Sequence, residues 1–430
     1  MERGHQNRYP RRNPSSSNSS SSSSLPKSSS FTANRSRNTN GSRFDHSTIT
    51  NSAPNNPNNQ RDLPRRRSSI TNKTRGGDEE QVTEDESSTF PILVGTCQFM
   101  CPEGERTQRE RLRDLAVFER LHGNPGKTSP SLAVKKFCRT ISTAQSSDVR
   151  PLPVLDDTLS YLLSLVDTTD HPFEVVHDFV FDRTRSVRQD LSIQNIVNDK
   201  AIHMYEKMVK FHILSHHKLR GRGSNADSSS AHYLNMEQLI KALTSLYNLY
   251  NANRDSNSIY ENEAEFQSLY VLLHLDYKRQ PTGESLSLWF RRAPRTIIRS
   301  KQMCFARRVL QCFRMGNYKR FFDIIAAEAS FLQYCIIEPY INEVRAKSLS
   351  CINSIGYKLH PYPLTKLSKL LIMKEPDLEI LCNACGLETS TDETGNKLLA
   401  TKQTTFCIPK AGFQSSNFPG IDQFESIDSV

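Results

Sequence analysis

Two pairs of cysteines have the spacing that a metal site would use. Cys97 and Cys101 are separated by three residues, and Cys382 and Cys385 by two. Structural zinc sites usually take four thiolate or imidazole ligands, supplied as two such pairs. The second pair falls inside a predicted helix and is distant from the first along the chain. We therefore interpret both pairs as small buried side chains, and we expect neither a metal nor a cofactor.

Histidines and glycines do not complete a catalytic site either. His203, His212, His216 and His217 fall on one predicted helix, but the glutamate of an HExxH motif is missing. Residues 221–223 read Gly-Arg-Gly without the strand and helix that a phosphate-binding loop requires. The sequence offers no coherent set of nucleophile, base and orienting group. We therefore expect the chain not to be an enzyme.

A basic stretch gives the strongest indication of chemistry. Residues 278–320 carry twelve lysines and arginines and a single acid, Glu284, and they include Trp289 and Phe290. Cations mixed with flat rings are typical of a surface that follows a nucleic-acid backbone. The alternative is a solvated helix face with Trp289 in the core, and the residues leave both open. The candidate phosphate contacts are Arg291, Arg292, Arg295, Arg299, Lys301, Arg307 and Arg308, with Lys366 and Lys369 further along.

Charges of both signs alternate in the stretch from Asp182 to Asp190. The arginines are Arg183, Arg185 and Arg188. Arginine and carboxylate side chains form strong, directional pairs when they are buried together. We interpret this group as an internal ion-pair network that fixes helix packing.

The spacing of apolar residues places these groups on helices. Leu155, Leu159, Leu162, Leu163 and Val166 follow intervals of 4, 3, 1 and 3 residues, which is one face of a helix. Successive helix pairs without a hairpin signal between them predict an all-α helical repeat array, in which each pair buries its apolar face on its neighbours. Similar stripes occupy 173–180, 202–214, 236–250, 266–275, 305–313, 321–332 and 336–352, and a short helix is expected over 132–141 with Lys135, Lys136 and Arg139 outward.

The pattern changes near Gly356. Residues 357–364 are extended and bounded by prolines, and two short helices are expected over 365–373 and 376–385. Residues 404–409 have the composition of a strand. Two helices followed by a strand pair predict a winged-helix-like unit. Residues 221–230 are expected to form a polar loop.

The first 89 residues cannot build a core. They consist mainly of Ser, Asn, Arg, Pro, Thr and Gly, and residues 1–77 hold 14 basic side chains against three acidic ones. Such a composition predicts a disordered tail, and Arg65 to Arg67 are either a nuclear import element or part of a basic linker. No window approaches the roughly 18 apolar residues that span a bilayer, and no signal peptide is present, so we expect a soluble intracellular protein.

Seven blocks of sequence occur in an order that identifies a family. They are GTCQFMCPEGER, AVKKFCRT, RPLPVL, FDRTRSVRQDL, EKMVKFHI, NEAEFQSLYVLLHL and LCNACGL. Together they resemble the Sac-three/GANP family, scaffolds of the nuclear messenger-RNA export complex TREX-two. The resemblance implies a TPR-like array that runs into a PCI-type module (named for proteasome lid, signalosome and initiation factor) with a C-terminal winged helix.

The resemblance also implies a domain organisation. The expected parts are a disordered tail at 1–89, the helical repeats at 90–275, the helical part of the PCI module at 276–356, the winged-helix-like unit at 357–410 and a flexible C-terminus at 411–430.

The same resemblance implies the function and the partners. We expect a non-catalytic scaffold in the nucleus, in the nucleoplasm or at the nuclear pore, that binds a second PCI-domain protein, a small acidic proteasome-lid-type subunit and RNA, without a membrane. The alternative is a centrosome or mitotic-spindle adaptor of the same family. Because the sequence ends at Val430 without nucleoporin-like repeats or a centrin-binding helix, pore tethering and centrin binding have no support in the sequence.

Overall fold

The structure is a computed structural model. It describes the backbone of residues 93–140, 145–168, 170–220, 226–254, 260–276 and 285–409, and the side chains of all of these except 226–229. The expected tail at 1–89 and the expected flexible C-terminus from 411 lie outside the described residues.

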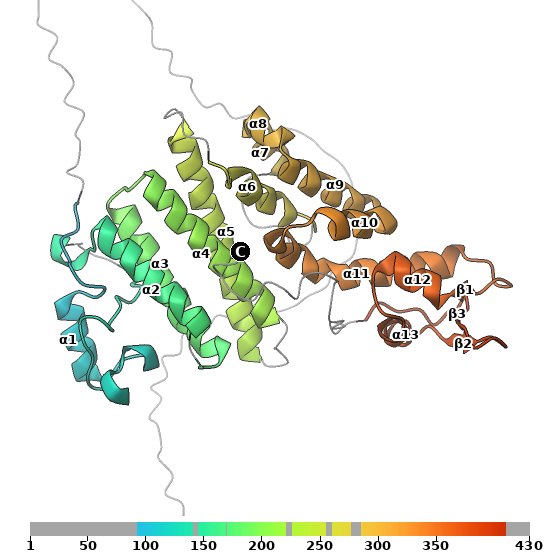
Figure 1. Ribbon diagram of the computed structural model, residues 1–430, viewed down its shortest axis with the longest axis horizontal. Coiled ribbons are helices and arrows are strands. Elements are labelled where there is room, and N and C mark those ends of the chain that lie inside the picture. Colours follow the sequence, from blue (N-terminus) through green and yellow to red (C-terminus); the bar gives the residue numbers. More distant parts are fainter. Residues whose placement is uncertain are drawn as a thin grey trace, which may run out of the picture. The chain divides into compact units, whose positions relative to one another are not determined.

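Helices dominate the described residues, and the mostly helical architecture predicted from the sequence is confirmed (Figure 1). The helices are α1 Glu103–Leu112, α2 Leu152–Thr168, α3 Phe173–Ile193, α4 Asp199–Arg220, α5 Ala226–Ala252, α6 Glu263–Leu272, α7 Leu286–Arg292, α8 Arg295–Arg299, α9 Lys301–Met315, α10 Tyr318–Glu328, α11 Phe331–Ile355, α12 Leu364–Leu371 and α13 Glu375–Ala384.

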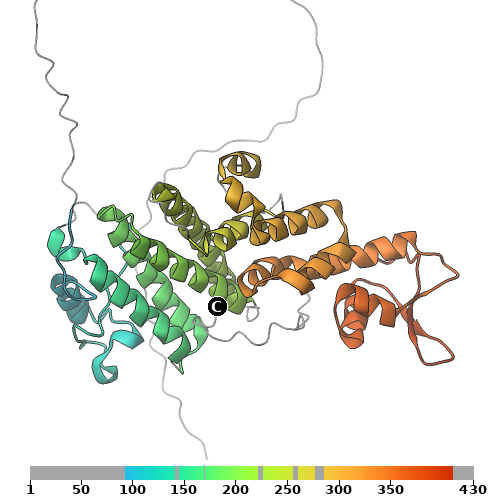
Figure 2. The same cartoon turned by 45° about the horizontal axis from the view of Figure 1, so that its top comes forward.

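Consecutive helices pack as pairs around a shared apolar core. α2 packs on α3 and α4 on α5, and the four lie side by side in both views (Figures 1 and 2). The apolar stripe read from the sequence is the buried face of α2, where Leu155, Leu159 and Leu162 are fully buried. Burial of these stripes supplies most of the stability of such pairs.

A second group of helices begins at α6. α9 packs on α6 and on α10. Ser300 caps the start of α9 by accepting a hydrogen bond from the Met303 N–H at 3.2 Å, and Gly316 ends it in the left-handed conformation that glycine adopts without strain. α11 is about 37 Å long and packs on both α4 and α6, so it joins the two groups.

The end of α11 carries the C-terminal unit. β1 Tyr362–Pro363, β2 Thr389–Thr391 and β3 Lys397–Leu399 form a three-stranded antiparallel sheet in the order β1-β3-β2, beside α12 and α13. The buried guanidinium of Arg345 on α11 donates to the carbonyls of Leu371 and Ile372 at 3.1 and 2.6 Å. These bonds satisfy carbonyls at the end of α12 and fix the unit to α11.

Three local predictions were wrong. Residues 132–139 form no helix, and the side chain of Lys135 is buried against α3 rather than exposed. Residues 404–409 form no strand; the strands come earlier, in β2 and β3. The expected polar loop at 221–230 is helical from Ala226 onward. In the first two cases, contacts with distant parts of the chain override the local pattern.

The segment before α2 is largely irregular and is held by close backbone approach. The N–H of Thr96 donates to the Ser146 carbonyl at 2.8 Å, and the N–H of Cys97 to the Val149 carbonyl at 3.0 Å. A Cβ atom on Gly95 would lie only 2.5 Å from the Val149 carbonyl oxygen. This contact explains why the first motif of the folded chain begins with glycine.

Replacing Gly95 with alanine should therefore lower the free energy of unfolding by about 1–3 kcal/mol, because backbone atoms must move to admit the methyl group. Urea unfolding followed by circular dichroism measures the change. Gly104→Ala is the matched control, because nothing lies within 4 Å of its Cβ position on α1 and alanine should stabilise that helix by about 0.5–1 kcal/mol. Equal stability of Gly95→Ala and the wild type would contradict the tight contact.

Candidate nucleic-acid interface and buried ion-pair networks

The seven candidate cations of the basic stretch lie on three consecutive helices, α7, α8 and α9, whereas residues 278–284 of the stretch lie outside the described residues. Ser285 caps α7, and Ala293 and Ile297 anchor the turn and the short helix α8 in the core. Trp289 is only 3% exposed and stacks on Tyr270 at 5.4 Å between ring centroids. The indole is therefore a core residue and is not available to stack on a base.

The cations of this stretch lie mostly on the surface. Arg291, Arg292, Arg295, Arg299, Lys301 and Arg307 are exposed, whereas Arg308 is half-buried. Arg308 pairs with Glu328 on α10, and Arg307 lies 5.7 Å from the Phe290 ring centroid. Among the described residues no ion pair engages Arg291, Arg295, Arg299 or Lys301. These four unpaired side chains are the cations of the stretch that are most available to a polyanion.

Two further candidate cations lie on the C-terminal unit. Lys366 and Lys369 are exposed and three residues apart on α12, whose opposite side buries Leu364, Leu367 and Leu371. α12 packs on α10, and α10 on α9. Of the nine candidate phosphate contacts, seven thus lie on α7–α9 and two on α12.

The charged stretch of α3 does not form one network. Asp190 is fully buried and accepts hydrogen bonds from the Lys135 Nζ and the Arg150 Nε, both at 2.7 Å. The Arg150 side chain also donates to the Ser186 hydroxyl at 2.9 Å. Neither Lys135 nor Arg150 was expected as a partner, and both belong to the irregular segment before α2. We call Asp190, Lys135, Arg150 and Ser186 the Asp190 network.

A second buried carboxylate, Glu119, was also missed from the sequence. It pairs with Arg109 of α1 and with Arg183 of α3, the latter at 3.1 Å. Its other contacts are backbone N–H groups of Ala116 and Val134, at 2.9 and 3.0 Å. Arg183 in addition contacts Asp182 at 2.5 Å. Glu119 thus binds α1, the irregular segment and α3 together.

Arg185 and Arg188 make other contacts. The guanidinium of Arg185 lies 3.8 Å from the centroid of the Phe137 ring, and Arg188 donates to the side-chain carbonyl of Gln238 on α5. Burial lowers the pKa of both arginines. The predicted group of arginines is therefore split among α5 and two parts of the irregular segment.

Comparison with known proteins identifies the family to which the chain belongs. The model of the SAC3/GANP family matches residues 100–391. That range contains both carboxylate networks and all helices from α1 to α13. The chain belongs to the SAC3/GANP family.

Relatives within the SAC3/GANP family come from plants, fungi and insects. The chain is 36% identical to SAC3 family protein B of Arabidopsis thaliana, over 72% of this chain and 18% of that protein. It is 31% identical to SAC3 family protein 1 of Schizosaccharomyces pombe, over 75% and 32%. It is 28% identical to Protein xmas of Drosophila melanogaster, over 74% and 16%. The chain thus matches about a third or less of the length of these relatives.

The two pairs of cysteines that the sequence singled out in this SAC3/GANP chain are buried thiols. Cys97, Cys101, Cys382 and Cys385 are buried, and burial raises the pKa of Cys101 to about 12. Within the described ranges, no group of three or more His, Cys, Asp or Glu side chains is placed to hold a metal ion. In the same part of the chain, no helix is both long and apolar enough to cross a membrane.

The histidines of α4 serve helix packing. His212 is buried, and its Nδ1 lies 2.8 Å from the Asn235 Oδ1 on α5. His216 contacts His232 of α5 at 2.8 Å, and His217 contacts Glu338 of α11 at 2.6 Å. These three histidines therefore face different partners on α5 and α11, whereas the exposed His203 lies 3.5 Å from Glu206 of its own helix.

Acidification should destabilise the fold through His212. Burial, with a smaller contribution from the nearby positive charge of Arg188, lowers the pKa of His212 to about 3. The unfolded chain takes up this proton near pH 6.5, whereas the folded chain does not until about pH 3, so stability is lost as the pH falls through that window. At pH 5 we expect His212 to cost about 2 kcal/mol, measured by urea unfolding at pH 7 and pH 5.

Other groups titrate in this range, so the measurement compares variants. His212→Gln should reduce the loss between pH 7 and pH 5 by about 2 kcal/mol, because glutamine takes up no proton. The control is His360→Gln, at an exposed histidine outside α4, which should retain the loss seen in the wild type. An identical pH dependence of His212→Gln and the wild type would exclude His212 as the origin.

Proposed function

We propose that the chain is a non-catalytic scaffold of a nuclear messenger-RNA export complex of the TREX-two type. The observation that carries the proposal is membership of the SAC3/GANP family over residues 100–391. The paired helices of α2–α5, followed by α6 and α8–α11, support a TPR-like array that continues into a PCI-type module. In this reading the chain contributes surfaces rather than reacting groups.

We propose that the C-terminal unit is a winged helix. The order α12, α13, β2, β3, with β1 completing a three-stranded antiparallel sheet, supports this assignment. The bonds between Arg345 and the end of α12 favour a rigid connection to α11. Lys366 and Lys369 on α12, with the exposed cations of α7–α9, then supply contacts to RNA phosphates.

A second PCI-domain protein and a small acidic subunit complete the proposed complex. The end of α11 and the loop after it favour a protein partner, because three large apolar residues are exposed there: Ile355 to 78%, Tyr357 to 79% and Leu359 to 87%. Exposed apolar groups gathered in this way mark interaction sites. We assign this loop to the second PCI-domain protein.

Affinity purification tests the proposal. Tagged chain isolated from nuclear extract should bring down a PCI-domain protein and a small acidic subunit in stoichiometric amounts. Tyr357→Asp with Leu359→Asp should lose the PCI-domain protein, because a charge in an apolar interface is desolvated without a partner. Val94→Asp, at another exposed apolar position, is the matched control and should lose nothing.

The purification of the wild-type chain decides whether the scaffold function holds. If the wild-type chain brings down neither protein, the scaffold function is wrong. The proposed location is the nucleus, and imaging of the tagged chain should show nucleoplasmic or nuclear-rim signal through interphase. A signal confined to spindle poles would favour the adaptor function instead.

A further inference from the structure

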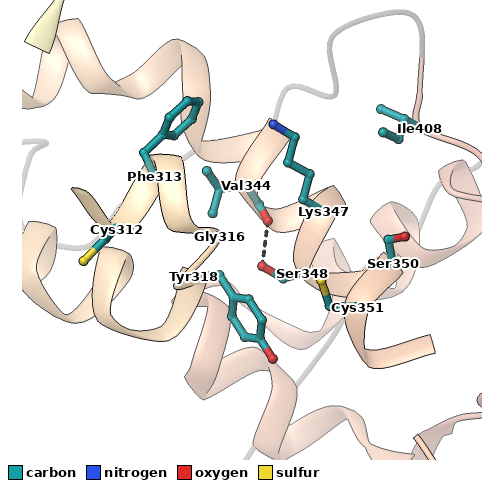
Figure 3. A pocket seen from close by; sticks show the side chains of 10 residues that line it. All are labelled: Cys312, Phe313, Gly316, Tyr318, Val344, Lys347, Ser348, Ser350, Cys351 and Ile408. Atoms are coloured by element: carbon teal, nitrogen blue, oxygen red, sulfur yellow. Dashed lines mark hydrogen bonds between the residues drawn. The ribbon is translucent and has the colours of Figure 1, made fainter. Parts of the chain in front are cut away.

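Hollows of different kinds occur in the described part of the chain. An apolar pocket of about 270 Å³ lies between the end of α9, the start of α10 and the middle of α11 (Figure 3). Lys347 on its wall is paired with Glu343 at 2.6 Å, and the Ser348 hydroxyl donates to the Val344 carbonyl at 2.6 Å. These two polar side chains are engaged within the protein, so they do not select a ligand. A groove between α2 and α4 has the opposite character, because charged side chains line it.

The α2–α4 groove has a volume of about 360 Å³ and a lining of titratable side chains. Asp156 comes from α2, and the other side chains repeat along one face of α4. Those of α4 are Lys200, His203, Glu206, Lys207 and Lys210. The groove therefore carries three lysines against two carboxylates.

Both carboxylates of the α2–α4 groove already have partners. Asp156 pairs with Lys200 at 3.0 Å. Glu206 is buried and accepts hydrogen bonds from the Tyr250 hydroxyl at 2.6 Å and from the Asn262 side-chain amide at 3.2 Å. These contacts leave neither carboxylate to neutralise a further lysine.

Two lysines of the groove have no acidic partner among the described residues. Lys207 is exposed and Lys210 is half-buried, and in this part of the chain no ion pair engages either of them. His203, one turn before Lys207, is exposed and lies 3.5 Å from Glu206. Cations that share a hollow without a counter-ion favour an occupant with negative charge.

An acidic run lies shortly before the first described residue, Leu93. Residues 78–86 hold six carboxylates and no basic side chain, and Asp85 and Glu86 are the last two of the six. Glu86 precedes Gly95 by nine residues, which span up to about 30 Å when extended. The place of Gly95 therefore limits where these carboxylates can bind.

Gly95 lies near one end of the α2–α4 groove. A Cβ atom on Gly95 would be 2.5 Å from the carbonyl oxygen of Val149. Asp156 follows Val149 by seven residues, most of them on α2, so the two Cα atoms are at most about 16 Å apart. Because Asp156 pairs with Lys200, this distance leads to the start of α4. The groove is thus within the span of the nine residues that precede Gly95.

We infer that the segment of this chain that carries Asp85 and Glu86 docks in the α2–α4 groove. The two carboxylates meet Lys207 and Lys210, the lysines without an acidic partner among the described residues. Exposed ion pairs contribute little one by one, but attachment to Gly95 gives the carboxylates a high effective concentration at the groove. A polyanion in solution competes with this segment for the same part of α4. The inference concerns a contact within the chain and does not depend on the proposed scaffold function.

Carbodiimide crosslinking of the purified full chain tests the contact. The reagent couples a carboxylate directly to an amine where the two touch, and mass spectrometry identifies the joined peptides. At low salt we expect Asp85 or Glu86 to be joined to Lys207 or Lys210. The product should decrease at about 0.5 M salt, where exposed ion pairs are screened. A wild-type chain that gives no such product at low salt would overturn the inference.

Two comparisons separate docking from chance collision. Lys366 and Lys369 on α12 are the matched control, because both are exposed and they have the same spacing as Lys207 and Lys210. Their product with the acidic segment should be at least about fivefold lower, and equal products would overturn the inference. An equal mixture of ¹⁵N-labelled and unlabelled chains should give products within one chain. Products that join labelled to unlabelled peptides would assign the groove to a second copy and would also overturn it.

A charge exchange tests the pairing itself. Lys207→Glu with Lys210→Glu should lose the crosslink, because the amines are removed and the groove becomes acidic. Adding Asp85→Lys with Glu86→Lys should restore it, with carboxylate and amine exchanged between the two sides. Circular dichroism confirms that each variant retains the helix content of the wild type. Failure of the exchanged chain to regain the crosslink while it remains folded would contradict the proposed pairs.

Neutralising the carboxylates should uncover the lysines. In Asp85→Asn with Glu86→Gln, acetylation of Lys207 and Lys210 by N-hydroxysuccinimide acetate should be at least about twofold faster than in the wild type, because each amine loses its ion pair. Lys366 should react at the same rate in both chains. Equal acetylation of Lys207 and Lys210 in the variant and the wild type would overturn the inference and leave the scaffold function untouched.

Discussion

Asp190→Asn should lower the free energy of unfolding by about 3–5 kcal/mol. Asparagine has nearly the same shape as aspartate, so packing on α3 is preserved while one negative charge is removed. The Lys135 ammonium and the Arg150 guanidinium, each 2.7 Å from the carboxylate, would remain buried without their counter-ion. The asparagine carbonyl can still accept a hydrogen bond from one of the two cations. That bond does not offset the free-energy cost of two buried charges without a counter-ion.

Asp178 provides the control on the same helix. Its side chain is 79% exposed, so Asp178→Asn should change stability by less than about 0.5 kcal/mol. Urea unfolding followed by circular dichroism compares the two variants. If both change stability equally, the Asp190 network does not hold the irregular segment to α3.

The same variant should also loosen the chain locally. The Asp190 network joins α3 to the segment that precedes α2, whereas Trp289 lies in the other group of helices. Proteolysis within residues 93–151 should therefore become faster in Asp190→Asn at urea concentrations where Trp289 fluorescence is still native. Replacing Lys135, Arg150 and Asp190 together by apolar residues should restore part of the stability, because no unpaired charge remains.

The long helices were predictable because their apolar residues repeat over many turns. The stripe on α5 from Met236 to Tyr250 was read from the sequence, and its Leu239, Leu243 and Leu246 are buried. The segment around Lys135 was not predictable in this way. Its helical pattern is overridden by a side chain that reaches the carboxylate 55 residues further along the chain.

The buried networks show where reading the sequence fails. Arg183 and Asp190 were singled out as a charged group, but their partners Glu119 and Arg150 lie 64 and 40 residues away. No local spacing connects them, and only the packing of α3 against the irregular segment brings them together. The sequence also left open whether Trp289 lies on a nucleic-acid-binding surface or in the core. The structure places the ring in the core, where it stacks on Tyr270.

The two helices of the C-terminal unit were predicted from the sequence, but its strands were not. Its two helices were expected from their apolar spacing, and α12 and α13 begin within one residue of the predicted positions. The strands could not be predicted in the same way, because β2 and β3 are three residues each and β2 is entirely polar. They are defined by pairing, since β3 pairs with both β1 and β2. Residues 404–409 look like a strand, but the N–H of Cys407 bonds to the Cys385 carbonyl at 2.9 Å outside any sheet.

Charge reversal of Arg291, Arg295 and Arg299 to glutamate should weaken RNA binding at least about tenfold at 0.1 M salt. These three side chains are exposed and, among the described residues, have no ion-pair partner, so they are available to phosphates. Each lost phosphate contact on a single strand lowers the slope of log affinity against log salt by about 0.7, so we expect the slope to fall by about 2. Fluorescence anisotropy with a labelled oligouridine at several salt concentrations measures both quantities.

Neighbouring residues supply controls that separate charge from structure. Lys207→Glu with Lys210→Glu adds the same kind of charge on α4 and should leave the salt slope unchanged. Trp289→Phe should destabilise the core without changing RNA affinity, because the indole is buried against Tyr270. Arg308→Gln should act chiefly on stability, since its guanidinium is already paired with Glu328. If the triple variant binds RNA with unchanged affinity and slope, the α7–α9 surface does not contact the phosphate backbone, and Lys366 and Lys369 remain the candidates to test.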